Sequence, residues 1–282
     1  MKEMRMPKEN IMEDLKYIPV RQPFFAALSD SYKKFTVNKY GIVHFFQFTT
    51  SAERMTAVPD GSVDMVFCCG DEPFAFVHGT VLKAEEIPFL PNRLYFGVRF
   101  IPGYNPILGE NAMGRLINNR IGFRELISDE KMLRNIFSED SFDKQIKAFT
   151  RSYMSIFERI RPMDKSNLIV RHSINMIFSR TGNVTVEQLA EETGYTPRYI
   201  NQCFRREIAM SPKNFIKIIR FQSALDMLHA EERKSLSEIA SALGYFDQPH
   251  FVKEFKQFAG ITPKKYEQFL DSRQYSSKIE IC

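Results

Sequence analysis

Short apolar runs separated by turn-forming residues make up the first third of the chain. The runs are rich in Val, Ile, Phe and Tyr and occupy residues 41–49, 62–69, 74–78 and 94–100. Pro-Asp-Gly at 59–61 and Gly-Asp at 70–71 are two of the turn signals between them. Runs of this length, broken by such turns, are typical of antiparallel strands. We expect residues 1–110 to form a small β-barrel or sandwich.

Apolar residues follow helical spacing in the rest of the chain, so the predicted fold class is α+β. From residue 113 to 160 they recur every three to four positions, as in amphipathic helices. A polar segment at 161–167, which contains Pro162, interrupts the pattern and marks a predicted domain boundary. We expect a helical connector or dimerisation segment at 111–163, an all-α domain at 164–272, and a loose tail at 273–282.

Two segments of the all-α region repeat one another. Residues 189–215 and 239–266 share a Gly-Tyr pair, a central Phe, and a Ser-Pro or Thr-Pro pair. Gly194-Tyr195 recurs as Gly244-Tyr245, Phe204 as Phe255, and Ser211-Pro212 as Thr262-Pro263. The offset between the copies rises from 50 to 51 residues, so the second copy has one additional residue in its turn.

Each copy carries the local signals of two helices joined by a tight turn. The capping-box pairs that start the first helices are Thr185 with Gln188 and Ser235 with Glu238. Gly194 and Gly244 suit the left-handed backbone that ends a helix, and Thr196 and Asp247 are suitable caps for the next one. Helices joined by so short a turn cross steeply, which presents the second helix to a DNA major groove.

The second helix of each copy has an apolar face and a polar face. The apolar sets are Ile200, Cys203, Phe204 and Ile208 in the first copy and Phe251, Phe255 and Phe258 in the second. The polar sets are Arg198, Asn201, Gln202 and Arg205 in the first copy and His250, Lys253 and Gln257 in the second. Arg, Asn and Gln can each make two hydrogen bonds to a guanine or adenine edge. A merely solvated face would have the same composition, but the repetition favours base reading.

A long helix is predicted between the two copies. It begins at Ser211-Pro212 and continues to about Ala230, with Phe215, Ile218 and Leu225 on its buried side. Its length would be about 28 Å. Successive faces of one major groove recur about every 34 Å, so such a rod could hold both second helices on one side of the duplex.

These residues closely resemble the AraC/XylS family of bacterial transcription regulators over about 168–270. The most specific match is GYFDQPHFVKEFKQFAGITPKKY at 244–266. The resemblance implies two helix-turn-helix subdomains, bridged by a long helix, that bind adjacent major-groove segments near promoters and usually activate transcription. It places base-reading residues at Arg198, Asn201 and Gln202, and at Gln248, Pro249, His250 and Lys253. Pro249 has no side-chain group that could hydrogen-bond a base, and Lys253 could hold a phosphate instead of a base.

The N-terminal half is also similar to a known domain. Residues 58–67 and 97–103 resemble a poorly characterised domain that precedes AraC-type units in some bacterial regulators. This resemblance implies a small β-barrel of sensory type and names no ligand.

Four residues of this half are candidates for a ligand pocket. Asp64 and Arg99 are charged residues within apolar runs, so each faces solvent, lines a polar pocket, or pairs with the other. His44 and His78 could also face the pocket. They could bind a metal together with Cys68 or Cys69, but the sequence has no metal-ligand spacing, and we expect neither a metal nor another cofactor.

Charge and cysteine content add little. The chain has 39 Lys and Arg residues against 34 Asp and Glu, an excess too small to indicate a nucleic-acid partner. Its four cysteines show no CxxC spacing or secretory framework, and the first ten residues lack an apolar signal core. No apolar stretch approaches the roughly 18 residues of a membrane span. We expect a cytoplasmic protein without a membrane partner.

The sequence predicts a sequence-specific transcription regulator, in the activator class, whose N-terminal domain modulates DNA binding. Expected partners are double-stranded promoter DNA, RNA polymerase, a small-molecule effector and a second copy of the chain. An alternative is a thiol-based alkyl-transfer enzyme fused to a DNA-binding unit, with Cys68 or Cys69 as acceptor. Their neighbours Phe67, Gly70 and Asp71 include no cation to activate a thiolate, and no GxSxG or HExxH motif is present, so we expect no catalytic residues. In a third reading, the repeat serves only protein contacts.

Overall fold

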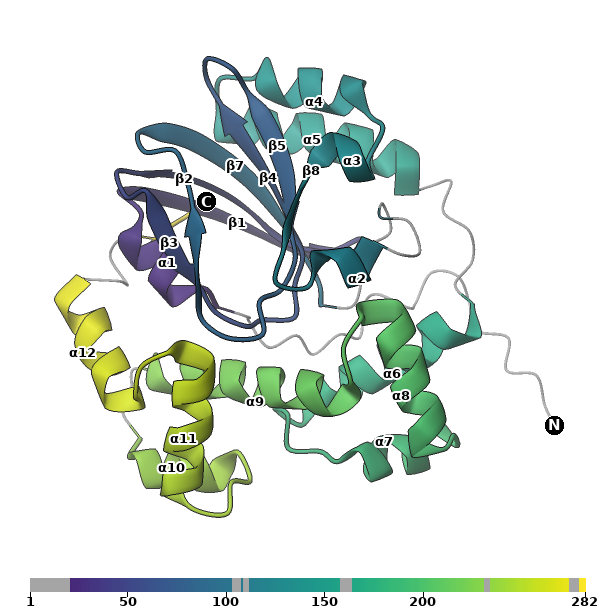
Figure 1. The fold of residues 1–282 in the computed structure, drawn as a ribbon. Helices are drawn as coiled ribbons and strands as arrows, with labels where there is room; N and C mark the ends of the chain where they lie inside the picture. Colours follow the sequence, from purple (N-terminus) through teal and green to yellow (C-terminus); the bar gives the residue numbers. More distant parts are fainter. Residues whose placement is uncertain (1–20, 103–107, 109–111, 158–163, 231–233, 274–278) are drawn as a thin grey trace.

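The computed structural model describes residues 21–102, 108, 112–157, 164–230, 234–273 and 279–282. It consists of a β-sheet with flanking helices and a separate layer of helices beneath it (Figure 1). This arrangement confirms the predicted α+β class.

A seven-stranded sheet forms the centre of the N-terminal half. Its spatial order is β8-β5-β4-β7-β2-β1-β9. The strands are β1 (Ser31–Lys39), β2 (Ile42–Thr50), β4 (Asp64–Cys69), β5 (Phe74–His78), β7 (Arg93–Phe100), β8 (Arg120–Gly122) and β9 (Ile279–Ile281). The strand pairs are antiparallel except β1 with β9, which run parallel. Two further strands, β3 (Arg54–Ala57) and β6 (Glu85–Pro88), form a small second sheet.

Both faces of the large sheet are covered, which explains why its strands contain continuous apolar runs. Neighbouring residues point to opposite faces of a strand, so Phe45 and Phe46 belong to different cores. One core lies under α3 (Phe123–Leu126), α4 (Glu130–Phe137) and α5 (Phe142–Phe157), where Phe45 packs against Phe149. The other includes residues of β3 and β6 and contacts α1 (Pro23–Leu28). A short helix, α2 (Ala112–Leu116), precedes β8.

The C-terminal half is entirely helical from residue 165 to 273 in its described parts. Its helices are α6 (Lys165–Ser179), α7 (Val186–Thr193), α8 (Pro197–Ile208), α9 (Pro212–Leu228), α10 (Leu236–Ala242), α11 (Gln248–Ala259) and α12 (Pro263–Arg273). The predicted caps are present, because Thr185 accepts a hydrogen bond from the backbone N–H of Gln188 and Ser235 from that of Glu238. Gly194 and Gly244 have φ of 71° and 70°, as a left-handed turn requires.

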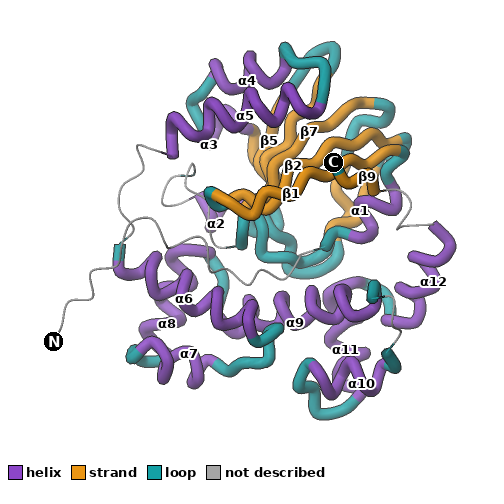
Figure 2. The backbone as a smooth tube through the Cα atoms, turned by 180° about the vertical axis from the view of Figure 1, so that it is seen from behind, coloured by secondary structure: helices purple, strands orange, loops and turns teal. Residues whose placement is uncertain are grey.

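Helix α9 is the centre of this half. Its buried residues occupy every side, including Phe215, Ile216, Ile218 and Phe221, which is the pattern of a helix surrounded by protein. One continuous apolar core contains residues of α6 to α12 together with Phe24 and Val58 from the N-terminal half. Figure 2 shows α9 running along the underside of the sheet layer, so the two halves are packed together along this helix.

Two segments differ from the expected organisation. The connector predicted at 111–163 contributes strand β8, and its helices α4 and α5 cover a face of the sheet. Residues 279–281, expected to lie in a loose tail, form β9 beside β1, with Tyr32 opposite Ile279. Both strands have only three residues, too few for a periodic signal, and each is held by a strand distant in sequence.

Candidate nucleic-acid interface and effector cavity

Helix α8 presents the predicted polar set on its outer side. Thr196 caps its N-terminus, and its apolar set, Ile200, Cys203, Phe204 and Ile208, is buried. The side chains of Arg198, Gln202 and Arg205 are exposed, and Asn201 is half-buried. The side-chain oxygen of Asn201 is buried without a hydrogen-bond partner among the described residues. These four side chains lie in the first three turns of α8, and recognition helices contact bases through their N-terminal residues.

Helix α11 has the same construction. Asp247 accepts a hydrogen bond from the backbone N–H of His250 at 2.7 Å, which caps the helix. Phe251, Phe255 and Phe258 are buried, as predicted from their spacing. The other predicted residues, Gln248, His250, Lys253 and Gln257, are all exposed.

A buried polar contact that the sequence did not reveal attaches α11 to α9. Glu254 is 5% exposed, accepts a hydrogen bond from the Tyr245 hydroxyl at 2.9 Å, and pairs with Lys217 of α9 at 2.7 Å. Burial raises the pKa of Tyr245, and the neighbouring Glu254 carboxylate raises it further. The phenol therefore stays protonated and donates to the carboxylate. This network fixes the second unit on the central helix.

Both second helices begin on the side of the molecule that faces away from the sheet. In Figure 1, α7 and α10 lie at the bottom, and α8 and α11 both run upward from them toward α9. Helix α9 has 17 residues, a length of about 25 Å. The two polar faces are therefore presented by helices whose N-termini point the same way.

The four pocket candidates lie in one row across four strands. His44 is opposite Arg99, Arg99 is also opposite Asp64, and Asp64 is opposite His78. The Arg99 guanidinium donates to both carboxylate oxygens of Asp64 and lies 3.2 Å from Asp60. Arg99 and Asp64 thus form a mutual ion pair, and sequence reasoning missed the third member, Asp60.

A cavity of about 30 Å³ lies beside this row, between the large sheet and the β3–β6 sheet. Asp60, Asp64, His78 and Arg99 line its polar end, and Phe46, Phe76 and Phe89 are among its apolar walls. Its volume is that of about one water molecule. Burial lowers the pKa of His78 to about 4, so this imidazole is neutral at pH 7. His44 is buried against Phe46, outside the cavity lining.

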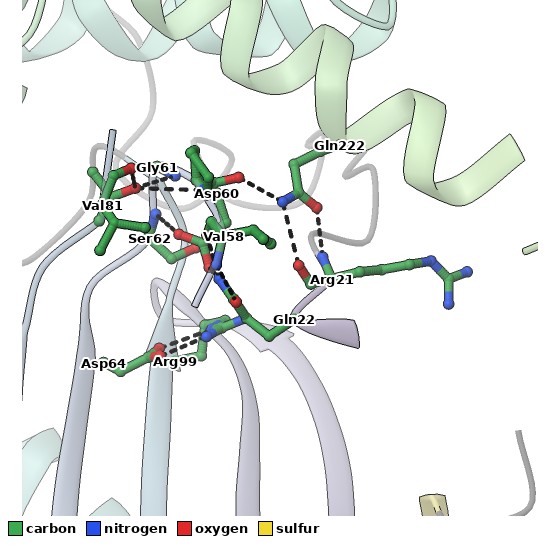
Figure 3. Close-up of polar contacts among 12 residues, drawn as sticks. Arg21, Gln22, Val58, Asp60, Gly61, Ser62, Asp64, Val81, Arg99 and Gln222 are labelled. Carbon is green, nitrogen blue, oxygen red and sulfur yellow. Dashed lines mark hydrogen bonds and ion pairs between the residues drawn. The ribbon is translucent and has the colours of Figure 1, made fainter. Parts of the chain in front are cut away.

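The loop at 58–62 connects this cavity to α9 (Figure 3). Gln22 donates a hydrogen bond to Asp60 at 2.8 Å and another to the carbonyl oxygen of Val58 at 2.6 Å. Gln222 of α9 donates to the carbonyl oxygen of Pro59 at 2.6 Å. Gly61 has φ of 75°, and a Cβ there would lie 2.9 Å from the Phe215 ring, so α9 packs directly on this loop.

The two cysteines considered as alkyl acceptors lie within strand β4. Cys68 and Cys69 are buried, and the Gln145 amide donates to Cys69 Sγ at 3.2 Å. Burial raises the pKa of Cys69, which disfavours the thiolate that an alkyl-transfer reaction would need. In the part of the chain that the structure covers, no three His, Cys, Asp or Glu side chains cluster as metal ligands. Within the same residues, no helix has the length and apolarity to cross a bilayer.

Two family models each match a part of the chain. Residues 189–268 match a family described as Helix-turn-helix domain, and residues 37–122 match a Domain of unknown function (DUF6597). The chain is 27% identical over 57% of its length to the uncharacterized HTH-type transcriptional regulator YtdP of Bacillus subtilis, and the match covers 19% of YtdP. It is 22% identical to the HTH-type transcriptional activator RhaR of Escherichia coli K12, over 72% of this chain and 75% of RhaR.

Among solved structures, ToxT from Vibrio cholerae matches with a TM-score of 0.42 and 12% identity, over 85% of this chain and 99% of that one. The match to YtdP and a further match to YobQ, also of Bacillus subtilis, span 19% and 46% of those two proteins, less than half of either.

Proposed function

We propose, from the helix-turn-helix match at 189–268 and the DUF6597 match at 37–122, that the chain is a sequence-specific transcription regulator of the AraC type. It reads two adjacent major-groove segments. Its DNA partner is double-stranded promoter DNA. It activates transcription by contact with RNA polymerase, and the N-terminal half adjusts its DNA binding.

One observation carries this proposal. The two helix-turn-helix units expose the outer faces of α8 and α11, and α9 holds both units within a single core. The exposed set of α8 consists of residue types that pair with base edges. Helix α9, at about 25 Å, is about three quarters as long as one turn of DNA, and as a rigid link it would hold the two faces in phase with successive openings of one groove.

Footprinting of the purified protein on genomic DNA tests the proposal. We expect protected sites that contain two sequence elements about one helical turn apart. The test variant is the double substitution Arg198→Ala, Gln202→Ala. Both side chains are exposed, so the fold should be retained while protection of the first element is lost. Failure of the wild-type protein to retain any duplex DNA at low salt would reject the proposal and favour a role in protein contacts only.

The effector acts, in this proposal, at the polar end of the cavity. A small molecule that inserts between Arg99 and Asp60 would displace the 58–62 loop, and Gln222 would transmit the displacement to α9. The variant Asp60→Asn weakens the ion pair between Arg99 and Asp60 in the absence of a ligand. Its DNA affinity should differ from that of the wild type by at least about fivefold, a typical allosteric coupling. Glu86→Gln, on the exposed β6 strand, is the control and should leave the affinity unchanged.

A homodimer is also part of the proposal, with the helices after β8 as the candidate surface. Sedimentation of the purified protein, alone and with DNA that carries one site, measures the number of copies bound. If one protein chain binds per DNA site, a single chain contacts both sequence elements.

A further inference from the structure

The structure identifies the additional residue of the second helix-turn-helix unit. Helices α8 and α11 each have 12 residues, and their caps Thr196 and Asp247 lie 51 positions apart. The glycines that follow the first helices, Gly194 and Gly244, lie 50 positions apart. Tyr195 and Tyr245 keep that shorter offset, so the inserted residue is Phe246. Its side chain is 95% exposed, which makes it the most exposed large apolar residue in the described parts of the chain.

The same register shows which residues of α11 occupy the places of the α8 polar set. Buried positions correspond, because Ile200 matches Phe251 and Phe204 matches Phe255. At the same offset, the counterparts of Arg198, Asn201, Gln202 and Arg205 are Pro249, Val252, Lys253 and Lys256. These four, with Gln248, line one shallow surface hollow on α11. His250 and Gln257 are exposed, but they correspond to Tyr199 and Arg206.

The two units therefore present different chemistry on equivalent surfaces. Where α8 has Arg198 and Asn201, α11 has Pro249 and Val252, neither of which can hydrogen-bond a base through its side chain. Phe246 adds an exposed ring immediately before the N-cap of the same helix. Lys253 and Lys256 remain on this surface as cations. Pro249 and Val252 line one hollow together with the two lysines, and this combination complements a DNA groove that has an apolar group on its floor and phosphates at its edges.

Only one base offers such a group in the major groove of B-form DNA, because the C5 methyl of thymine is the sole apolar feature among the four base edges. Apolar side chains contact this methyl in known complexes, whereas phosphates accept from lysine without sequence preference. We propose that the second helix-turn-helix unit recognises thymine methyl groups through Phe246, Pro249 and Val252, with Lys253 and Lys256 on the phosphates. This inference rests on the proposed function and assigns the base chemistry of its second element.

Replacement of thymine by deoxyuridine provides the test, because it removes the methyl group and keeps every hydrogen-bonding group of the base pair. Binding is measured by fluorescence anisotropy on a footprinted site with single replacements. Each replacement that removes a contacted methyl group in the second element should lower the affinity about fourfold, which corresponds to the free energy of burying one methylene group. The same replacements in the first element should leave the affinity unchanged. Equal affinity for thymine and deoxyuridine throughout the second element would overturn the inference while leaving DNA binding intact.

Variants test whether the discrimination between thymine and deoxyuridine comes from Phe246 and Val252. Phe246→Ala and Val252→Ala should each bind the thymine and deoxyuridine sites more equally than the wild type does, and Phe246→Ala, at a nearly fully exposed position, does not disturb the core. Gln202→Ala, in the other unit, should keep the full discrimination. A Phe246→Ala protein that binds DNA and discriminates like the wild type, but no longer activates transcription with purified RNA polymerase, would overturn the proposal and make this surface a polymerase contact. If the wild-type protein bound no duplex DNA at all, the proposed function itself would be rejected.

Discussion

Gln222 of α9 and Pro59 of the cavity loop are joined by a hydrogen bond of 2.6 Å although they are 163 residues apart. Gln222 is fully buried and also bonds the backbone of Arg21 through both of its side-chain polar atoms. One side chain therefore connects the central helix of the DNA-binding half to two segments of the N-terminal half. The relationship predicts that this residue stabilises the junction between them.

Gln222→Ala should lower the free energy of unfolding by about 1–3 kcal/mol, because the buried carbonyl of Pro59 loses its donor. Urea denaturation measures the change. Gln257→Ala is a matched control on an exposed helix face and should stay within about 0.5 kcal/mol of the wild type. Similar stabilities for the two variants would show that the contact contributes nothing to the junction.

Arg99 should contribute more to stability than any exposed arginine. Arg99→Met leaves the buried carboxylate of Asp60 and the partly buried carboxylate of Asp64 without their cation, and the free energy of unfolding should fall by about 3–5 kcal/mol. Arg54→Met breaks an exposed pair with Glu86 and should cost less than about 1 kcal/mol. Urea denaturation of both variants checks the difference, and equal losses would contradict the buried ion-pair assignment.

Acid should destabilise the protein because burial lowers the pKa of three imidazoles, those of His44, His78 and His229. Burial lowers the pKa of His78 and of His229 from 6.5 to about 4 in the folded chain. Between these pH values the unfolded chain binds protons that the folded chain does not, so the free energy of unfolding falls as the pH falls from 6.5 to 4. The loss can reach about 3 kcal/mol per histidine. His78→Gln removes one titrating group and should make the free energy of unfolding depend less steeply on pH. An unchanged slope would contradict the neutral state of the His78 imidazole in the folded chain.

The helix-turn-helix units could be predicted because their signals are local. A capping box, a turn glycine and a helical apolar face all lie within about 30 residues of one another in each copy. The ion pair of Asp64 with Arg99 remained one of several alternatives, because strand alternation does not say which face is buried. Asp60, Gln22 and Gln222 were not predicted, since their contacts join segments distant in sequence. The inserted residue was detectable as a change of offset between the turn glycines and the predicted caps, whereas the exposure of its ring could be seen only in the structure.

Gln202 should read one base. Gln202→Ala is expected to relax the preference at a single position of the site and to cost about 1–3 kcal/mol of binding free energy, because a bidentate contact is lost. Competition binding against sites with each base at each position measures both effects. Unchanged preference and affinity would exclude Gln202 as a reader.

Lys253 should act on the backbone of the DNA. Lys253→Ala is expected to weaken binding to all sequences alike, and the slope of log affinity against log salt should fall by about one, because one fewer counterion is released. Salt titrations on a specific and a random duplex measure both quantities. A loss confined to one sequence would assign Lys253 to base reading instead.

Helix α9 should hold the two second helices, α8 and α11, in phase with the DNA groove, and the spacing between the two sequence elements tests this arrangement. Binding is measured on a series of duplexes in which base pairs are inserted between the elements. The account predicts that about five added base pairs, half a turn, reduce the affinity to that of a single element, because a rigid helix cannot follow the second element to the opposite side of the duplex. Affinity that is unchanged by this insertion would contradict it.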